Sequence, residues 1–281
     1  MKPKEILVFG ATGQIGRHLI RKLTKNNYKV VAVTRNIHQK GYILKTQANP
    51  GYLEIVELTY FNIEKIKNLV KECSICINLI GILFEKRKNF FKNIHTDFPD
   101  LLSKLSAKQN IEKLIHISSL GIEKSLDSNY AISKLDGENK IKNNFDRAVV
   151  LKPSIVYSVD DKFTTNFMTL LNRLPIMPIY YEGKTKFAPI HVTDLVQIIF
   201  DVVQGKTNEQ TIECIGPEIF SFKEIILKIL KTIDKKRLLI PLPLVIAKMM
   251  AKIFEIMPNP LITVDQINLL KCDNISSGKY K

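Results

Sequence analysis

The sequence has 281 residues, of which 45% are hydrophobic and 25% charged, with 12 glycines and 12 prolines. This composition is typical of one large globular domain, or one domain with an appendage, and excludes a collagen-like or largely disordered chain. No uninterrupted apolar run approaches about 18 residues, and the first residues lack the apolar stretch of a secretion signal. We therefore expect a cytoplasmic protein with no membrane-spanning helix.

The chain is strongly basic, because 42 Lys and Arg residues outnumber 27 Asp and Glu residues and give a formal net charge of +15. That excess favours an anionic partner such as nucleic acid, a membrane surface or an acidic protein. It is also typical of an AT-rich coding sequence, in which Lys, Ile and Asn are abundant and Trp is absent. Because no motif interleaves aromatic and basic residues, we expect no nucleic-acid partner.

The first half of the chain alternates short apolar runs with amphipathic stretches, the pattern of βαβ units and a parallel sheet. The predicted strands are Glu5–Phe9, Lys29–Val33, Leu53–Glu57, Ile75–Leu79, Lys113–Ile117 and Ala148–Leu151. The predicted helices are Gln14–Lys25, Ile63–Glu72, Asp97–Gln109 and Tyr130–Asn144. We therefore expect an α/β fold with a Rossmann-type, doubly wound parallel sheet over residues 1–155.

After Pro153 this alternation breaks down. The elements expected next are a helix, a strand and a second helix, at Thr164–Arg173, Phe187–Val192 and Asp194–Val203. The carboxylate of Asp194 is expected to cap the last of these helices. We expect residues 156–281 to form a smaller, mostly helical C-terminal lobe, from which 187–204 returns to the Rossmann domain.

A glycine-rich segment, Gly10-Ala11-Thr12-Gly13-Gln14-Ile15-Gly16, directly follows the first strand and opens a helix. Glycines at this spacing permit a tight turn and a close approach of the backbone to a pyrophosphate, and the helix N-terminus attracts that anion. The strand before it and the helix and strand after it meet the context that the motif requires. The segment predicts dinucleotide binding through Gly10, Thr12, Gly13, Gln14, Ile15 and Gly16.

The end of the second strand indicates which nucleotide is bound. NAD-binding folds of this type carry an acidic residue about 20 positions after the glycines, which accepts from the ribose 2′-hydroxyl. This chain has Thr34 and Arg35 there instead. Because a guanidinium binds a phosphate with two parallel hydrogen bonds, Arg35 favours NADP(H) over NAD(H), with Arg17 assisting. The alternative is that Arg35 is only a solvated surface charge.

Tyr130 and Lys134 form a Y-x-x-x-K at the start of a predicted helix. Because side chains four positions apart share one helix face, we expect the ammonium to lower the pKa of the phenol. Ser118 and Ser119 follow the fifth strand, at the carboxyl edge of the sheet where open α/β folds bind ligands. Together these residues predict a hydride-transfer site.

Several of these segments carry a family resemblance. "VFGATGQIGRHLI", "SSLG", "YAISK" and "LKPSIVYS" resemble an extended or atypical short-chain dehydrogenase/reductase over residues 4–205. "NLIGILFE", "FFKNIH", "GKTKFAPIHVTDL" and the tail "PLITVDQINLLKCDNI" further resemble bacterial members of the family of the 39-kDa nucleotide-binding accessory subunit of respiratory complex I. Generic epimerases and reductases do not share that tail.

The resemblance implies roles for individual residues. Gly10, Gly13 and Gly16 would hold the pyrophosphate, and Arg35 the adenosine phosphate. Tyr130 and Lys134 would reach the nicotinamide ribose, which Pro153 and Ser154 would border. In that family the nucleotide is regarded as structural, so the resemblance implies a peripheral accessory or assembly subunit attached to the peripheral arm of complex I.

The alternative is a free oxidoreductase or epimerase, with Tyr130 as acid/base and Lys134 as its tuner. Two features speak against a sugar-nucleotide substrate. Ser119 and Tyr130 are separated by only ten residues, and the apolar Ile82-Leu83-Phe84 follows the fourth strand.

The stretch Leu244–Met257 combines a wide apolar surface with Lys248 and Lys252 at helical spacing. It fits either a core helix of the C-terminal lobe or a helix that presents its apolar face to a partner or to anionic lipids. The second interpretation places the protein on the cytoplasmic face of the inner membrane. Cys73 and Cys76 form a C-x-x-C, but no second pair completes a zinc site, and no two of the five histidines have a metal-ligand spacing. We therefore expect no metal site.

Overall fold

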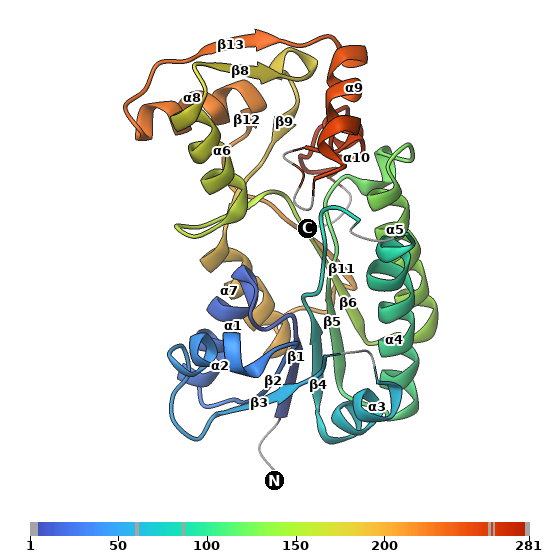
Figure 1. Cartoon of the computed structure of the whole chain (residues 1–281). Helices are drawn as coiled ribbons and strands as arrows, with labels where there is room; N and C mark the ends of the chain where they lie inside the picture. The colour runs from blue at the N-terminus through green and yellow to red at the C-terminus, as the bar shows by residue number, and fades with distance from the viewer. Residues whose placement is uncertain (1–4, 60–61, 86–87, 258–259, 261, 279–281) are drawn as a thin grey trace.

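A computed structural model describes residues 5–59, 62–85, 88–257, 260 and 262–278. In it a seven-stranded sheet runs through the molecule in the order β11-β6-β5-β4-β1-β2-β3, with every neighbouring pair parallel (Figure 1). Its strands are β1 Glu5–Phe9, β2 Lys29–Thr34, β3 Leu53–Glu57, β4 Ile75–Asn78, β5 Lys113–Ile117, β6 Ala148–Pro153 and β11 Thr211–Cys214. The expected Rossmann-type α/β fold is confirmed.

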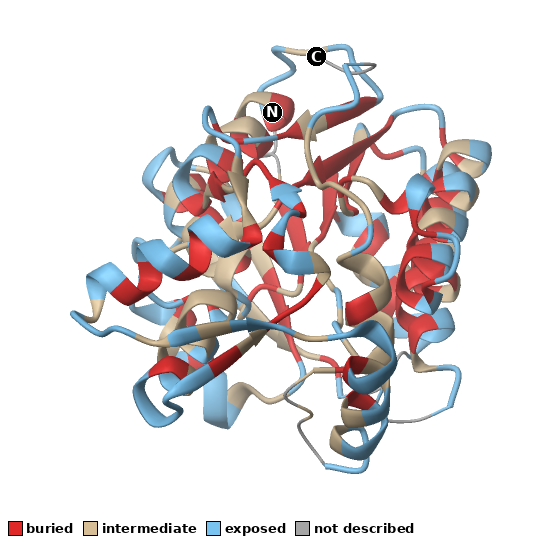
Figure 2. Ribbon diagram, turned by 90° about the horizontal axis from the view of Figure 1, so that it is seen from above, coloured by how far each residue is buried: buried red, intermediate tan, exposed pale blue. Residues whose placement is uncertain are grey.

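Helices cover both faces of this sheet, which explains why its strands are continuous apolar runs. Alternate residues of β1 enter two separate hydrophobic cores, Ile6 and Val8 on one face and Leu7 and Phe9 on the other. The first core is closed by α1 Gln14–Lys25, α2 Ile37–Lys45 and α7 Val192–Val203. The second is closed by α3 Ile63–Glu72, α4 Phe98–Lys108 and α5 Asn129–Asn144. Figure 2 shows the buried residues concentrated along the central strands.

Three expected elements differ from the structure. The helix expected from Asp97 is preceded by a π-helical turn, Lys92–Asp97. The strand expected at Phe187–Val192 is divided, because Pro189 interrupts it, into β9 Lys186–Phe187 and β10 Ile190–His191. Asp194 as a helix cap is wrong: α7 begins two residues earlier, and the His191 imidazole accepts from the Thr193 N–H.

The remaining chain above the sheet combines helices with short two-stranded sheets (Figure 1). Its strands are β7 Val156–Tyr157, β8 Ile176–Ile179, β12 Phe220–Ser221 and β13 Leu238–Pro241, which pair as β7 with β10, β9 with β12 and β8 with β13. Its helices are α6 Lys162–Arg173, α8 Phe222–Thr232, α9 Leu244–Phe254 and α10 Val264–Leu269. Within the described residues, no helix has both the length and the apolar character needed to cross a membrane.

Candidate functional site

The glycine turn lies between β1 and α1, where the strand order changes direction around β1. Gly10 has a φ of +76°, and a Cβ there would lie 2.9 Å from the carbonyl carbon of Leu79. A Cβ on Gly16 would lie 2.4 Å from the Ala11 carbonyl oxygen, so both positions require glycine. Gly13 occupies the N-cap of α1 and has no side chain to accept from the first-turn N–H groups. The turn thus offers a helix N-terminus to an anion, as a dinucleotide pyrophosphate requires.

The loop after β7 contacts the first turns of α1. The side-chain amide of Gln14 donates to Val156 O at 3.3 Å and to Ser158 Oγ at 3.0 Å. Arg17 forms an ion pair of 2.7 Å with Asp160. Because Asp160 already neutralises this guanidinium, a phosphate would compete with a carboxylate for it. Thr12 and Ile15, which the sequence also assigned to nucleotide binding, are partly buried, and Ile15 packs against the first hydrophobic core.

The exposed side chain of Arg35 follows β2 at the carboxyl edge of the sheet. Beside it the Asn36 side chain caps α2 by accepting from Gln39 N at 2.9 Å. Glu57, at the end of β3, accepts from Ile37 N at 3.2 Å. Two first-turn N–H groups of α2, those of Ile37 and Gln39, therefore have side-chain partners, and the positive charge of Arg35 remains at the surface of this edge.

Tyr130, Lys134 and Ser119 come together at the carboxyl ends of β4 and β5. The buried Tyr130 hydroxyl shares a hydrogen bond with the Ser119 side chain. Lys134 Nζ donates to Ile117 O at 3.0 Å, and a Cβ on Gly81 would lie 3.5 Å from that nitrogen. Ser119 and Tyr130, which the sequence grouped in one site, are therefore neighbours, whereas the contact of Lys134 with the end of β5 was not predicted.

The electrostatics of this pair differ from the expectation. Burial raises the pKa of Tyr130 above its ordinary value, although the Ser119 hydrogen bond opposes the shift. Burial also lowers the pKa of Lys134 to about 8. The expected lowering of the phenol pKa is therefore wrong, because desolvation of the phenolate outweighs the hydrogen bond from Ser119, and the negative charge of Asp265 raises the pKa further.

Ser118, in contrast, is engaged in a buried network of charged groups. Its hydroxyl donates to Glu138, whose carboxylate also lies 3.3 Å from Lys152 Nζ. Both charged side chains are 2% exposed, and Lys152 also pairs with Glu123. Burial lowers the pKa of Lys152 to about 8 and raises that of Glu138. Ser118 thus serves the packing of α5 against β5 and β6.

Sequence reasoning missed His95, which comes from the π-helical turn before α4. Its ring meets that of Tyr130 edge to face, with centroids 5.2 Å apart, and stacks on Phe91. Nε2 accepts from Ile82 N at 3.1 Å, and Nδ1 lies 3.0 Å from Ser133 Oγ. Burial lowers the pKa of His95 to about 2, so the imidazole is neutral at physiological pH. The ring of His95 therefore packs against Tyr130 with both of its nitrogens engaged by the protein.

Pro153 ends β6, and Ser154 follows it in a buried position. The Ser154 hydroxyl donates to Asn274 Oδ1 at 2.5 Å, so the C-terminal segment covers this strand end. Within the described ranges, no three His, Cys, Asp or Glu side chains gather as metal ligands.

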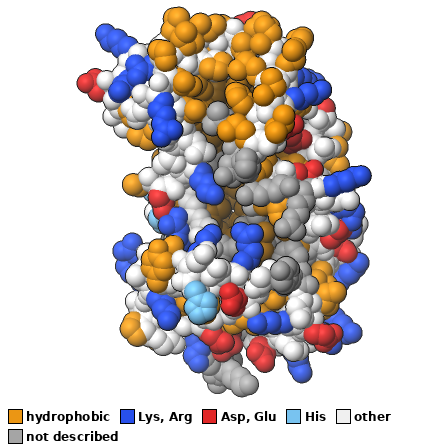
Figure 3. Space-filling view, viewed as in Figure 1, with side chains coloured by type: hydrophobic (Ala, Val, Ile, Leu, Met, Phe, Trp, Pro, Cys, Tyr) orange, Lys and Arg blue, Asp and Glu red, His pale blue; other side chains and the backbone are white. Residues whose placement is uncertain are grey.

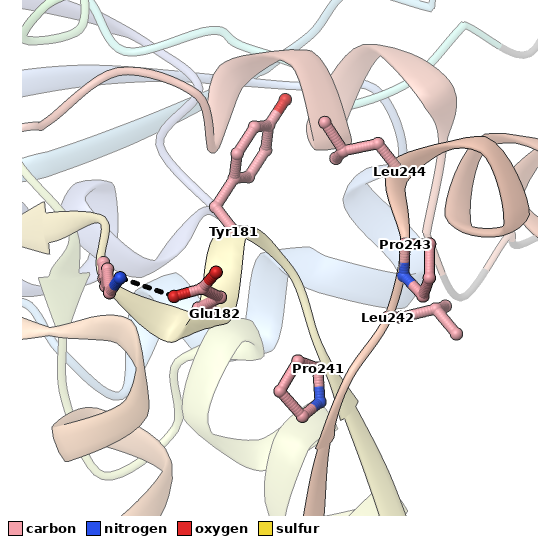
Figure 4. Close-up of a pocket in the computed structure, with 7 residues that line it drawn as sticks. Tyr181, Glu182, Pro241, Leu242, Pro243 and Leu244 are labelled. Carbon is pink, nitrogen blue, oxygen red and sulfur yellow. Dashed lines mark ion pairs between the residues drawn. The ribbon is translucent and has the colours of Figure 1, made fainter.

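A separate cavity of about 500 Å³ opens in the C-terminal lobe, between the ends of β8 and β13. Most of its lining side chains are apolar, and the polar groups are the Tyr181 hydroxyl and the ion pair of Glu182 with Lys184 (Figure 4). The lining residues are Tyr181, Glu182, Lys184, Pro241, Leu242, Pro243 and Leu244. None of them belongs to the predicted nucleotide site.

Helix α9 begins at this cavity and presents most of its apolar residues to the surface. Ala247 and Ala251 are buried, whereas Val245 is 73% exposed, Met249 62% and Ile253 63%. Apolar side chains also gather over β8 and β13 at the top of Figure 3. Helix α9 therefore contributes one narrow face to the core of the lobe and leaves most of its larger apolar residues exposed. We call the outward residues Val245, Met249 and Ile253 the α9 face.

The fold and the glycine turn agree with comparisons to known proteins. A model described as the NAD dependent epimerase/dehydratase family matches residues 6–215, and the chain belongs to this family. The structure resembles a UDP-glucuronic acid 4-epimerase from Bacillus cereus in complex with UDP-glucuronic acid and NAD, with TM-score 0.71, 19% identity and coverage of 97% of this chain and 95% of that one. It also resembles the Bordetella bronchiseptica enzyme WbmG in complex with NAD, with TM-score 0.70, 14% identity and coverage of 86% and 82%.

Curated relatives cover nearly the whole chain. The mitochondrial NADH dehydrogenase (ubiquinone) 1 alpha subcomplex subunit 9 of Arabidopsis thaliana is 28% identical over 96% of this chain and 70% of its own length. The mitochondrial NADH-ubiquinone oxidoreductase 40 kDa subunit of Neurospora crassa is 24% identical over 92% and 68%. These relatives confirm the resemblance to the accessory-subunit family of complex I.

Proposed function

We propose that this protein is an NADP(H)-binding accessory subunit of bacterial NADH:quinone oxidoreductase, attached to its peripheral arm. The observation that carries the proposal is similarity to subunits of that enzyme over 92% to 96% of the chain, reaching past the matched epimerase/dehydratase segment into the C-terminal lobe. Its role is to support assembly or stability of the complex, with the nucleotide as a structural component.

The site residues fit a dinucleotide. Gly10, Gly13 and Gly16 bring backbone N–H groups to the pyrophosphate, in a turn that a Cβ at either outer glycine would disrupt by clashing with the backbone of Leu79 or Ala11. Arg35 binds the 2′-phosphate, which selects NADP(H). Tyr130 and Lys134 hold the nicotinamide ribose, and Pro153 and Ser154 border the ring. A bound nicotinamide supplies a hydride donor or acceptor.

Two features support a structural role for the nucleotide. The raised pKa of Tyr130 keeps the phenol protonated, so that it holds a ribose by hydrogen bonding. Asn274 Oδ1 accepts from the Ser154 hydroxyl at 2.5 Å, so the C-terminal segment lies against the strand end that would border the ring. The chain's own residues thus bind and orient the nucleotide, and the C-terminal segment packs beside them.

The α9 face supplies the contact with the membrane surface beside the peripheral arm. Val245, Met249 and Ile253 would enter the interfacial region, while Lys248 and Lys252 face anionic headgroups. This arrangement places the protein on the cytoplasmic face of the inner membrane without a spanning segment.

Removal of the protein from its host tests this proposal. We expect a strain without it to show reduced NADH:quinone oxidoreductase activity and accumulated subcomplexes on native gels. Re-expression of the wild-type chain restores both, which is the matched control. Normal assembly and activity in the deletion strain contradict the proposal.

A second candidate is a free NADP(H)-dependent oxidoreductase acting on a small, apolar molecule, favoured by the Ser119–Tyr130 hydrogen bond beside Lys134. In that case Tyr130→Phe abolishes turnover of added NADPH and leaves nucleotide affinity nearly intact. An unchanged rate in Tyr130→Phe, or no turnover by wild-type protein, excludes this candidate.

A further inference from the structure

The C-terminal segment, residues 263–277, returns from the lobe to the carboxyl ends of β5 and β6 (Figure 1). Its helix α10 packs outward on α9, because the fully buried Ile267 shares a hydrophobic cluster with Ala247 and Ala251. Glu255, just after α9, also accepts from Val264 N at 2.8 Å. The segment is therefore anchored in the lobe at one end.

On its inner side α10 holds the N-terminus of α5, the helix that carries Tyr130. The Asp265 carboxylate accepts from Asn129 N at 2.6 Å, from Tyr130 N at 3.3 Å and from Ser128 Oγ at 2.8 Å. A helix leaves its first N–H groups without intrahelical partners, and a carboxylate there is favoured by the helix dipole. Asp265 thus fixes the turn in which Tyr130 lies.

Nine residues later, Asn274 joins the ends of two central strands. Its Nδ2 donates to Leu120 O at 2.6 Å, and its Oδ1 accepts from Ser154 Oγ at 2.5 Å. Its backbone adds two bonds to the β9–β10 segment, from its own N–H to Lys186 O at 2.7 Å and from Ala188 N–H to its carbonyl at 3.2 Å. One side chain therefore bridges Leu120, in the loop after β5, and Ser154, directly after β6.

We propose that Asp265 and Asn274 are positioning residues of the nucleotide site, so that nucleotide binding and the docking of residues 263–277 stabilise each other. The inference rests on the proposed function, because Tyr130 and Ser154 are the two nicotinamide-side residues that these contacts hold. By reciprocity, a segment that improves nucleotide binding is itself held more firmly when the nucleotide is bound. The C-terminal lobe thereby senses whether the site is occupied.

The test uses the full-length chain and NADPH. We expect Asp265→Ala and Asn274→Ala to release NADPH about tenfold faster than wild type, a change of about 1.4 kcal/mol if association is unaffected. Asp265→Asn, which keeps one acceptor, should give an intermediate rate. The matched control is Lys271→Ala, because Lys271 lies in the same segment but is 61% exposed and pairs only with the half-exposed Asp127 in the described structure.

Hydrogen exchange supplies a second measurement, which distinguishes lost coupling to the nucleotide from a general loss of stability. In wild-type protein, NADPH should slow amide exchange in residues 263–277, and in Asp265→Ala that added protection should disappear. If Asp265→Ala does not fold, Asn274→Ala and Asp265→Asn carry the same comparison. Wild-type protein that binds NADPH, with unchanged release in the variants, overturns this inference alone. Wild-type protein that binds neither NADPH nor NADP⁺ overturns the proposed function together with it.

Discussion

Lys152 and Glu138 form an ion pair beneath the nucleotide site, 3.3 Å apart and each 2% exposed. The pair joins β6 to α5, so it fixes the helix of Tyr130 and Lys134 from below as Asp265 does from its end. Removing one member of a buried pair leaves the other charge without compensation.

We therefore predict that Lys152→Met lowers the free energy of unfolding by about 3 kcal/mol or more. The double variant Lys152→Met/Glu138→Gln should be the more stable of the two, because no buried charge is left uncompensated; Glu123, the other partner of Lys152, is 46% exposed. Urea unfolding of both variants, with the exposed Lys206→Met as control, measures this. A single variant as stable as wild type contradicts the account of this pair.

The buried neutral histidines make stability depend on pH. His95 has a folded-state pKa of about 2, below its ordinary value, so the unfolded chain binds more protons as the pH falls below about 6.5. This contribution to stability should therefore be complete above about pH 6.5 and decline as the pH falls from about 6.5 toward about 2, by up to about 1.4 kcal/mol per pH unit for each such histidine.

Replacement of His95 measures how much this residue contributes to the pH dependence of the unfolding free energy. We expect His95→Gln to flatten the decline in unfolding free energy, whereas the exposed His38→Gln leaves it unchanged. Chemical unfolding at a series of pH values provides the measurement. Equal slopes for wild type and His95→Gln would show that His95 titrates normally in the folded state.

Arg35 should determine nucleotide preference. We expect Arg35→Gln to weaken NADPH binding about tenfold while NADH binding changes little, because only NADPH carries the 2′-phosphate. Fluorescence titration of both nucleotides measures the ratio, and the exposed Arg21→Gln on α1 serves as control. A variant that loses affinity for both nucleotides equally would exclude Arg35 as the phosphate ligand.

The α9 face should control attachment to lipid. We expect Val245→Asp/Ile253→Asp to reduce binding to vesicles that contain phosphatidylglycerol about tenfold, since two apolar contacts are replaced by charges that anionic lipid repels. Leu227→Asp is the matched control, because Leu227 is an exposed apolar residue on α8. Co-sedimentation gives the readout, and equal losses in the two proteins would mean that the α9 face has no specific role.

Much of the fold was predictable because each central strand is a short, continuous apolar run between helices. The helix Ile37–Lys45 was missed, since Gly41 and polar residues break its apolar stripe, although Asn36 offered an N-cap signal. Strand β11 was missed because Thr211–Cys214 is short and follows the break in the alternation.

Only part of the candidate site was predictable from the sequence. The glycine turn and the Tyr130–Lys134 spacing are local patterns, so the sequence indicates them directly. The contacts of Asp265 and of Lys152 with α5 join residues far apart in the chain, and Ser128 lies 137 positions from Asp265. No periodicity or spacing reports such pairs, because tertiary packing alone creates them.

The measurement that tests the central claim most directly is native separation of mildly solubilised membranes from the source cells, followed by extraction of nucleotide from the band that contains this protein. We predict co-migration with NADH:quinone oxidoreductase activity and recovery of NADP(H) from that band. A small species that migrates apart from the activity and turns over added NADPH would contradict the account.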